Sequence, residues 1–180
     1  PRRGQVYPVG PKASGPEGRS MTPRSGIGVD VHPLISGRPL VLGGVTVPFE
    51  KGVAGHSDGD VLIHAVIDGL LGGAGLGDIG THFPSSDSKY EGISSATLLG
   101  LTLDLLSQHG WRPLYVDATI LAERPALKPF MDRMRQALAT SLGLELSAVN
   151  LKATTTDGLG FVGRGEGIGS LAIATVEELT

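Results

Sequence analysis

The chain has 180 residues, of which 40% are hydrophobic and 18% are charged, and its formal net charge is −3. A chain of this length and composition can bury enough apolar surface to fold as one domain without covalent cross-links. Because the net charge is slightly negative, the chain has no excess of positive charge to attract nucleic acid or an anionic membrane surface, so we expect neither partner. The chain has no cysteine, which excludes disulfides and thiolate metal sites and suits a reducing compartment. We therefore expect a cytoplasmic protein in which any metal is bound by His, Asp or Glu.

Residues 1–24 differ from the rest of the chain in composition. They are rich in Pro, Gly, Arg and Ser and show no apolar periodicity. This pattern predicts a disordered tail, either a tag remnant or a linker from an upstream domain. Residues 25–180 are predicted to form the folded domain.

Apolar periodicity predicts strands and helices in mixed order. In chain order, the prediction is a strand at 26–32, a hairpin at 40–47, a helix to 71, a helix from 94 or 95 to 108, a strand at 112–122, a helix across 127–142, and strands at 149–155 and 170–176. Because the order lacks strict β–α–β alternation, we expect an α/β (α+β) fold with a single mixed β-sheet and about three helices on one face.

The first of these helices is apolar nearly all round, which predicts that it is buried. Ser57 and Asp60 precede it with the spacing of a capping box. Gly72 and Gly73 are predicted to end it.

A candidate metal site combines this helix with the first strand. Asp30 and His32 are two positions apart on a strand, so their side chains point to the same side. His64 lies within the buried helix and needs a partner, because a buried polar group without one costs roughly 1–3 kcal/mol. Asp60 and Asp68 lie four residues to either side of His64, and either could bond its ring.

Two readings of these residues remain open. His64 can be a structural histidine bonded to Asp60 or Asp68, with Asp30 and His32 as a pair near a strand end. Alternatively, two His and one Asp supply the three protein ligands of a catalytic zinc site, with a carboxylate bonded to the free ring nitrogen of His64. For the set as a whole we favour the metal.

Several motifs together carry a resemblance to a known enzyme family. They are Gly28-Val29-Asp30-Val31-His32, Ala54-Gly55-His56-Ser57-Asp58-Gly59-Asp60 with His64, Gly77-Asp78-Ile79-Gly80, Ala153-Thr154-Thr155-Thr156 and Gly163-Arg164-Gly165-Glu166-Gly167. In this order and spacing, across residues 26–179, the chain resembles the 2-C-methyl-D-erythritol 2,4-cyclodiphosphate synthases. The resemblance implies a mixed sheet with helices on one side, assembled as a homotrimer with active sites at subunit interfaces.

The resemblance also implies an activity and its cofactors. The enzyme would be a phosphorus–oxygen lyase of the non-mevalonate isoprenoid pathway. It would convert 4-diphosphocytidyl-2-C-methyl-D-erythritol 2-phosphate to the cyclic diphosphate and CMP. By resemblance, Asp30, His32 and His64 bind Zn²⁺, and Asp157 binds Mg²⁺ or Mn²⁺ at the substrate diphosphate.

Further roles follow from the same resemblance. His56 and Thr155 would be the catalytic, transition-state-stabilising residues. The substrate-binding residues would be Ser57, Asp78, Ile79, Gly80, Phe83, Pro84, Ser85, Ser86, Asp87, Ala122, Pro125, Ala126, Lys128, Thr154, Thr155, Thr156, Asp157, Phe161 and Arg164. This chain has Ser85 where many of these enzymes have aspartate, and Ala126 where many have lysine.

Two other functions are compatible with the same residues. A zinc-dependent phosphohydrolase would use metal-bound water as its nucleophile. A metal- and nucleotide-binding module would bind the same ligands without turnover.

Overall fold

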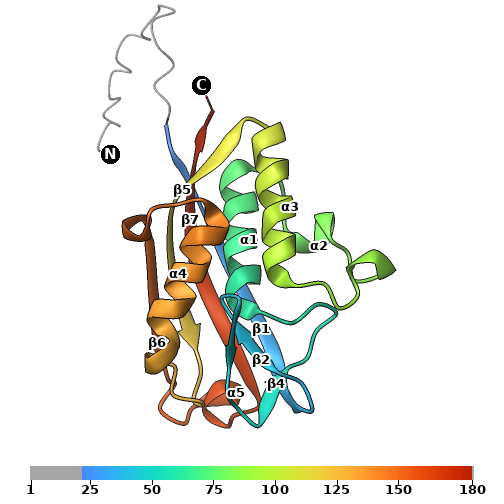
Figure 1. Ribbon diagram of the computed structural model, residues 1–180, viewed down its shortest axis with the longest axis vertical. Coiled ribbons are helices and arrows are strands. Elements are labelled where there is room, and N and C mark those ends of the chain that lie inside the picture. The colour runs from blue at the N-terminus through green and yellow to red at the C-terminus, as the bar shows by residue number, and fades with distance from the viewer. Residues whose placement is uncertain (1–21, 180) are drawn as a thin grey trace, which may run out of the picture.

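The computed structural model describes residues 22–179 (Figure 1), so the predicted tail falls almost wholly outside the described residues. The first strand, β1, begins at Arg24 and runs to Ser36, and is therefore longer than the periodicity predicts. Asp30 and His32 lie within the part of β1 that pairs with β7, opposite Ser170 and Ile168.

The main sheet has five strands in the order β4-β1-β7-β5-β6. β5 and β6 pair in parallel, and the other neighbours pair antiparallel, so the predicted mixed sheet is confirmed. A separate two-stranded sheet of β2 and β3 forms the hairpin predicted at the glycine pair Gly43-Gly44. The strand bounds are β1 Arg24–Ser36, β2 Leu40–Leu42, β3 Val45–Val47, β4 Lys51–Val53, β5 Trp111–Leu121, β6 Val149–Thr154 and β7 Gly167–Glu178.

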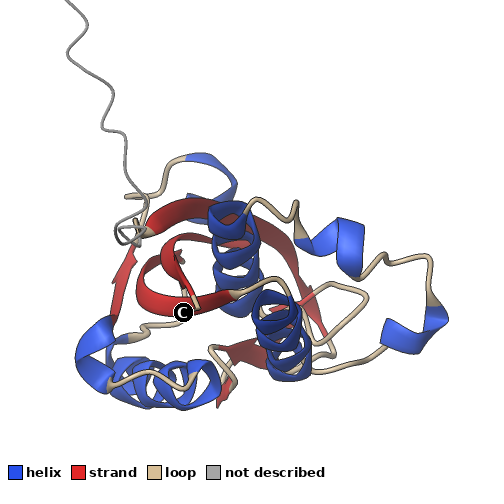
Figure 2. Cartoon of the chain, turned by 90° about the horizontal axis from the view of Figure 1, so that it is seen from above, coloured by secondary structure: helices blue, strands red, loops and turns tan. Residues whose placement is uncertain are grey.

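Three long helices cover one face of the sheet, as predicted (Figures 1 and 2). α1 packs on β1 and β7, α3 packs on α1 and β5, and α4 packs on β6 and α3. The helix bounds are α1 Val61–Ala74, α2 Ile79–His82, α3 Ser95–Gln108, α4 Met131–Leu142 and α5 Gly160–Gly163, with 3-10 turns η1 Ser88–Tyr90, η2 Lys128–Phe130 and η3 Leu146–Ala148. Among residues 22–179, no helix is long and apolar enough to cross a membrane.

α1 is the buried helix that its composition predicts, but both of its predicted ends are wrong. The capping side chain is Asp60, which accepts hydrogen bonds from the backbone N–H groups of Leu62 and Ile63. At the other end the helix continues through Gly72 and Gly73 and ends at Gly75, which has a left-handed backbone conformation.

The glycines near the end of α1 serve its contact with β1. A Cβ atom added at Gly26 would lie 2.2 Å from the carbonyl oxygen of Gly69 and 2.3 Å from the backbone nitrogen of Gly73. A Cβ atom at Gly28 would lie 1.9 Å from the carbonyl oxygen of Ala65. Strand and helix therefore touch backbone to backbone, which brings the side chains at Asp30 and His64 within reach of each other.

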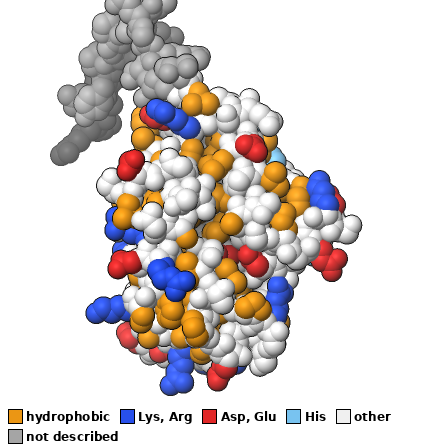
Figure 3. Space-filling view, in the orientation of Figure 1, with side chains coloured by type: hydrophobic (Ala, Val, Ile, Leu, Met, Phe, Trp, Pro, Cys, Tyr) orange, Lys and Arg blue, Asp and Glu red, His pale blue; other side chains and the backbone are white. Residues whose placement is uncertain are grey.

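The other face of the sheet is apolar and has no cover within residues 22–179. Ile27 pairs with Ile173, and Val29 with Leu171, across β1 and β7. With Val31, these side chains are 42–66% exposed, and we call this set the apolar sheet face. The helix-covered face differs, because acidic and basic side chains are interspersed over it (Figure 3).

Because β1 and α1 touch backbone to backbone, we expect Gly→Ala substitutions to change the free energy of unfolding in opposite directions at two positions. Gly28→Ala should lower the free energy of unfolding by about 1–3 kcal/mol or more, because strand and helix must separate. Gly100→Ala should raise it by about 0.5–1 kcal/mol, because Gly100 is exposed inside α3 and its Cβ would meet open space. Urea unfolding of both variants measures the two changes, and equal stabilities would contradict this packing.

Candidate active site

Three potential metal ligands converge between β1 and α1. Asp30 Oδ2 lies 3.0 Å from His32 Nε2 and 3.0 Å from His64 Nδ1. The ligand atoms of the three residues all lie within 4.8 Å of one another. The prediction that Asp30, His32 and His64 can share one ion is therefore confirmed in its geometry.

The outer ring nitrogens make this donor set suitable for a cation. His32 Nδ1 bonds to the carbonyl oxygen of Ala54, which can only accept, so this nitrogen carries a proton. His64 Nε2 lies 2.9 Å from Ser95 Oγ and 3.1 Å from Ser57 Oγ. Each ring thus has its outer nitrogen engaged, as metal-ligating histidines do, and turns the other toward Asp30.

The electrostatics of the group favour an ionised carboxylate. Burial opposes ionisation of Asp30, but hydrogen bonds and charge interactions with His32 and His64 outweigh it and hold its pKa well below the usual range. The hydrogen bond to Asp30 raises the pKa of His32, against the opposing effect of burial. The carboxylate is therefore available as an anionic ligand across the neutral pH range.

The predicted carboxylate partners of His64 are wrong. Asp60 is fully buried, and its two oxygens accept from four backbone N–H groups, those of Gly43, Gly44, Leu62 and Ile63. Asp68 accepts from the backbone N–H of Ile79 at 2.7 Å. Spacing on one helix face does not detect this competition from backbone donors.

A cavity of about 270 Å³ opens beside the three ligands, and we call it the triad pocket. Eight of its lining residues lie outside the triad, and six of these eight belong to the predicted site. The lining consists of Asp30, His32, His56, Ser57, His64, Ile79, Gly80, Phe83, Ser85, Tyr90 and Leu98. His56 Nε2 is buried there without a hydrogen-bond partner among the described residues, so this polar atom is free for a ligand.

Four other residues predicted around this pocket do not line it: Asp78, Pro84, Ser86 and Asp87. Asp78 caps α2 through the backbone N–H of Thr81, and Asp87 caps η1 and forms an ion pair with Lys89. Hydrogen bonding within these turns lowers the pKa of both carboxyl groups.

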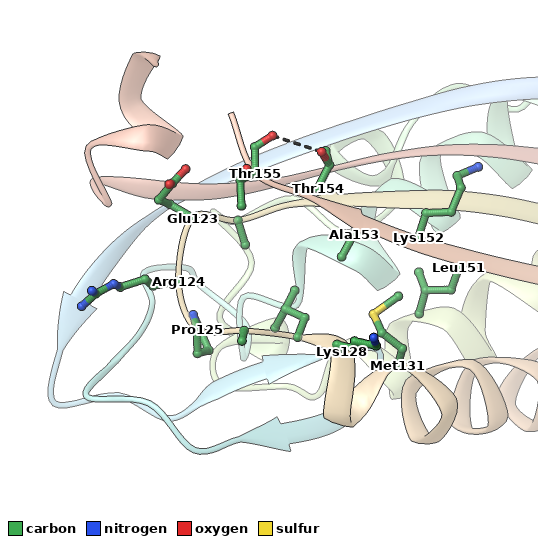
Figure 4. Close-up of a pocket in the computed structure, with 13 residues that line it drawn as sticks. Glu123, Arg124, Pro125, Lys128, Met131, Leu151, Lys152, Ala153, Thr154 and Thr155 are labelled. Carbon is green, nitrogen blue, oxygen red and sulfur yellow. Dashed lines mark hydrogen bonds between the residues drawn. The ribbon is translucent and has the colours of Figure 1, made fainter. Parts of the chain in front are cut away.

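A larger cavity of about 790 Å³ lies at the other end of the predicted site, and we call it the loop pocket (Figure 4). The loop after β5, the start of α4 and strand β6 form its walls. It contains the predicted residues Ala122, Pro125, Ala126, Lys128, Thr154 and Thr155, together with Glu123, Arg124, Leu127, Met131, Leu151, Lys152 and Ala153. The loop pocket and the triad pocket share no lining residue, so one chain divides the predicted site into two parts.

The remaining predicted residues lie within α5 or close to its two ends. Asp157 has a positive φ of 52° and is exposed, and the Thr155 hydroxyl lies 3.4 Å from its Oδ1. Phe161 is exposed, and Arg164 forms a two-point ion pair with Glu166 at 2.9 Å. Thr156 bonds to the carbonyl oxygen of Leu159. None of Thr156, Asp157, Phe161 or Arg164 lines the triad pocket or the loop pocket.

Comparison with known proteins identifies the family. The model of the YgbB family matches residues 23–177. The chain belongs to this family. A relative from Pelotomaculum thermopropionicum, named 2-C-methyl-D-erythritol 2,4-cyclodiphosphate synthase, is 54% identical over 155 residues, which cover 86% of this chain and 96% of the relative.

Solved structures of family members agree with the fold. A 2C-methyl-D-erythritol-2,4-cyclodiphosphate synthase in a form bound to CDP is 33% identical, with a TM-score of 0.78, and the match covers 85% of this chain and 99% of that one. The bifunctional IspDF from Campylobacter jejuni is 39% identical with a TM-score of 0.85, and the match covers 89% of this chain but 43% of that one. The mixed sheet with helices on one face is thus the family architecture.

Proposed function

We propose that this chain is a 2-C-methyl-D-erythritol 2,4-cyclodiphosphate synthase, a phosphorus–oxygen lyase of isoprenoid precursor synthesis. Family membership and the names of relatives about 54% identical over most of the chain support the proposal. The observation that carries it is the convergence of Asp30, His32 and His64 on one point in a cavity that also contains His56 and Ser57.

The proposed reaction needs no nucleophile from the protein. A 2-phosphate oxygen of the substrate attacks the β-phosphorus, the bond from that phosphorus to the oxygen bridging the α-phosphate breaks, and CMP leaves with that oxygen. The enzyme must bring two anionic groups together and align them, a task met by positioning and electrostatics. Zn²⁺ held by Asp30, His32 and His64 would supply Lewis-acid polarisation of a phosphate oxygen.

The chain's own polar groups are suited to the anionic parts of this substrate. His56 Nε2 is buried and unpartnered among the described residues, so it can donate to the 2-phosphate in the triad pocket. The Thr155 hydroxyl and Asp157 lie together beyond the end of β6, where the carboxylate can hold Mg²⁺ or Mn²⁺ at the diphosphate. Ser57, Ile79, Gly80, Phe83 and Ser85 would surround the erythritol.

We assign the cytidine to the loop pocket. Its volume of about 790 Å³ and its mixed lining suit a nucleoside. Residues 122–128 line it together with Met131, whose side chain Figure 4 draws beside that of Lys128. The family structure that contains CDP is consistent with a cytidine nucleotide as the ligand.

We further propose a homotrimer whose active sites combine the triad pocket of one subunit with the loop pocket of its neighbour. Two features support this assembly. The apolar sheet face exposes five large hydrophobic side chains in one patch, which is typical of a subunit interface. The two pockets of one chain share no lining residue, although one substrate must span both.

The reaction itself is testable with isotopically labelled water. Incubation with the diphosphocytidyl substrate, Zn²⁺ and Mg²⁺ in H₂¹⁸O should release CMP and a cyclic diphosphate without ¹⁸O, because the nucleophile is a substrate oxygen. His64→Ala should lose zinc and CMP release together, and His109→Ala, on an exposed histidine, should lose neither. Label in a linear phosphate product would instead support the phosphohydrolase, and CMP binding without turnover would support the binding module.

Sites shared between subunits predict complementation between two inactive variants. His64→Ala disables the triad pocket, and Ala153→Phe fills the loop pocket. Each variant alone should be inactive, whereas co-folding equal amounts should restore about a quarter of the wild-type rate. This fraction follows because a site is intact only when its triad half comes from the Ala153→Phe chain and its loop half from the His64→Ala chain, each with a chance of about one half.

The rate of the co-folded mixture, measured by CMP release, checks this prediction. An inactive mixture of exchanged subunits, with sedimentation showing trimers, would mean that each site is built within one chain.

A further inference from the structure

The hydrogen-bond partners of His64 determine which of its ring nitrogens carries the proton. Ser95 has one hydroxyl proton, and it donates that proton to Asp58 Oδ1. Ser95 Oγ can therefore only accept from His64 Nε2, 2.9 Å away. A proton on Nε2 leaves the lone pair of Nδ1 pointing toward Asp30 Oδ2.

Asp58 is held firmly enough to orient this serine. Its Oδ2 accepts from the backbone N–H of Ser95 at 3.0 Å, and its Oδ1 accepts from the backbone N–H of Asp60 at 3.2 Å. Its own backbone N–H donates to the carbonyl oxygen of Ile93 at 3.1 Å. Ser95 is fully buried, so no water competes for its hydroxyl.

Capping of α3 does not account for the arrangement. The cap of α3 is Ser94, whose side chain accepts from the backbone N–H of Thr97. The Asp58 carboxylate instead reaches the first residue of the helix from a loop 37 positions earlier in the chain. This contact places the Asp58 carboxylate beside the Ser95 hydroxyl, whose oxygen faces His64.

Asp30 makes the hydrogen bonds from Asp58 through Ser95 to His64, which we call the relay, important for metal binding. Its carboxylate lies 3.0 Å from His64 Nδ1 and attracts a proton to that nitrogen, which would block the lone pair needed for a metal. The chain of Asp58, Ser95 and His64 Nε2 attracts the proton to the opposite side of the ring. Ser57 Oγ also lies near His64 Nε2, but it competes less strongly than Ser95 for a hydrogen bond to that nitrogen. It lies farther away, at 3.1 Å, and also accepts from the backbone N–H of Gly59.

We propose that Asp58 and Ser95 are positioning residues that hold His64 with its proton on Nε2 and its Nδ1 ready to bind metal. The inference rests on the metal site of the proposed function. Neither residue is in the set of site residues predicted from the sequence.

Zinc affinity, measured by competition with a chromophoric chelator, tests this relay. Ser95→Ala and Asp58→Asn should each weaken zinc binding roughly 10–100-fold, as loss of a partner behind a ligating histidine does. Ser107→Ala and Asp104→Asn make the same chemical changes at exposed positions of α3 and should leave the affinity unchanged. If Ser95→Ala fails to fold, Ser95→Cys replaces it, because a thiol is a poor hydrogen-bonding group of similar size.

Two comparisons separate positioning from a merely structural role. Ser95→Ala keeps the backbone bond from residue 95 to Asp58, so a loss of affinity in this variant belongs to the hydroxyl. The double variant should bind zinc no more weakly than the weaker single variant, because Asp58 acts through Ser95. The proposal would be overturned if the zinc affinity of Ser95→Ala stayed within about threefold of wild type. That change is well short of the loss expected on removing a hydrogen-bond partner of a ligating histidine. Fully additive losses in the double variant would overturn the proposal too.

The zinc titration contains no substrate, so its outcome is independent of the proposed reaction. Weakened zinc binding in a protein that releases no CMP would refute the cyclase and leave this inference standing. Unchanged zinc binding in the variants of a protein that releases CMP would refute this inference and leave the cyclase standing.

Discussion

The candidate site depends on the backbone contact between β1 and α1. At Gly26 and Gly28 no side chain separates the strand from the helix, and a Cβ atom at either would overlap the helix backbone. This contact allows the short side chain of Asp30 to reach His64 at 3.0 Å while His32 approaches from the same strand. Because protein interiors are close-packed, even a small separation of these two elements would move His64 away from Asp30 and His32.

The same sheet connects the site to the proposed assembly. On β1, Asp30 and His32 face the helices, whereas the alternate residues Ile27, Val29 and Val31 point to the uncovered side. Period-2 geometry thus places the candidate metal ligands and the apolar sheet face on opposite sides of one strand. The division of the site into a triad pocket and a loop pocket gives the proposed interface a functional reason, because the proposed substrate would contact residues of both pockets.

Local patterns predict a large part of this arrangement. Alternation along the first strand predicts that Asp30 and His32 share a side, and the apolar character of α1 predicts that His64 is buried and needs a partner. The C-terminal end of α1 and the partner of His64 are not local properties. Gly72 and Gly73 continue the helix because β1 passes beside them, and Ser95, which contacts His64, is bonded to Asp58, 37 positions earlier in the sequence.

The central claim is that one metal ion binds Asp30 Oδ2, His32 Nε2 and His64 Nδ1 together. Anomalous diffraction at the zinc edge from crystals of the zinc-loaded protein tests it most directly. We expect one strong peak per chain, about 2.0–2.2 Å from each of these three atoms. A peak elsewhere, or one bound through the outer nitrogen of either histidine, would contradict it.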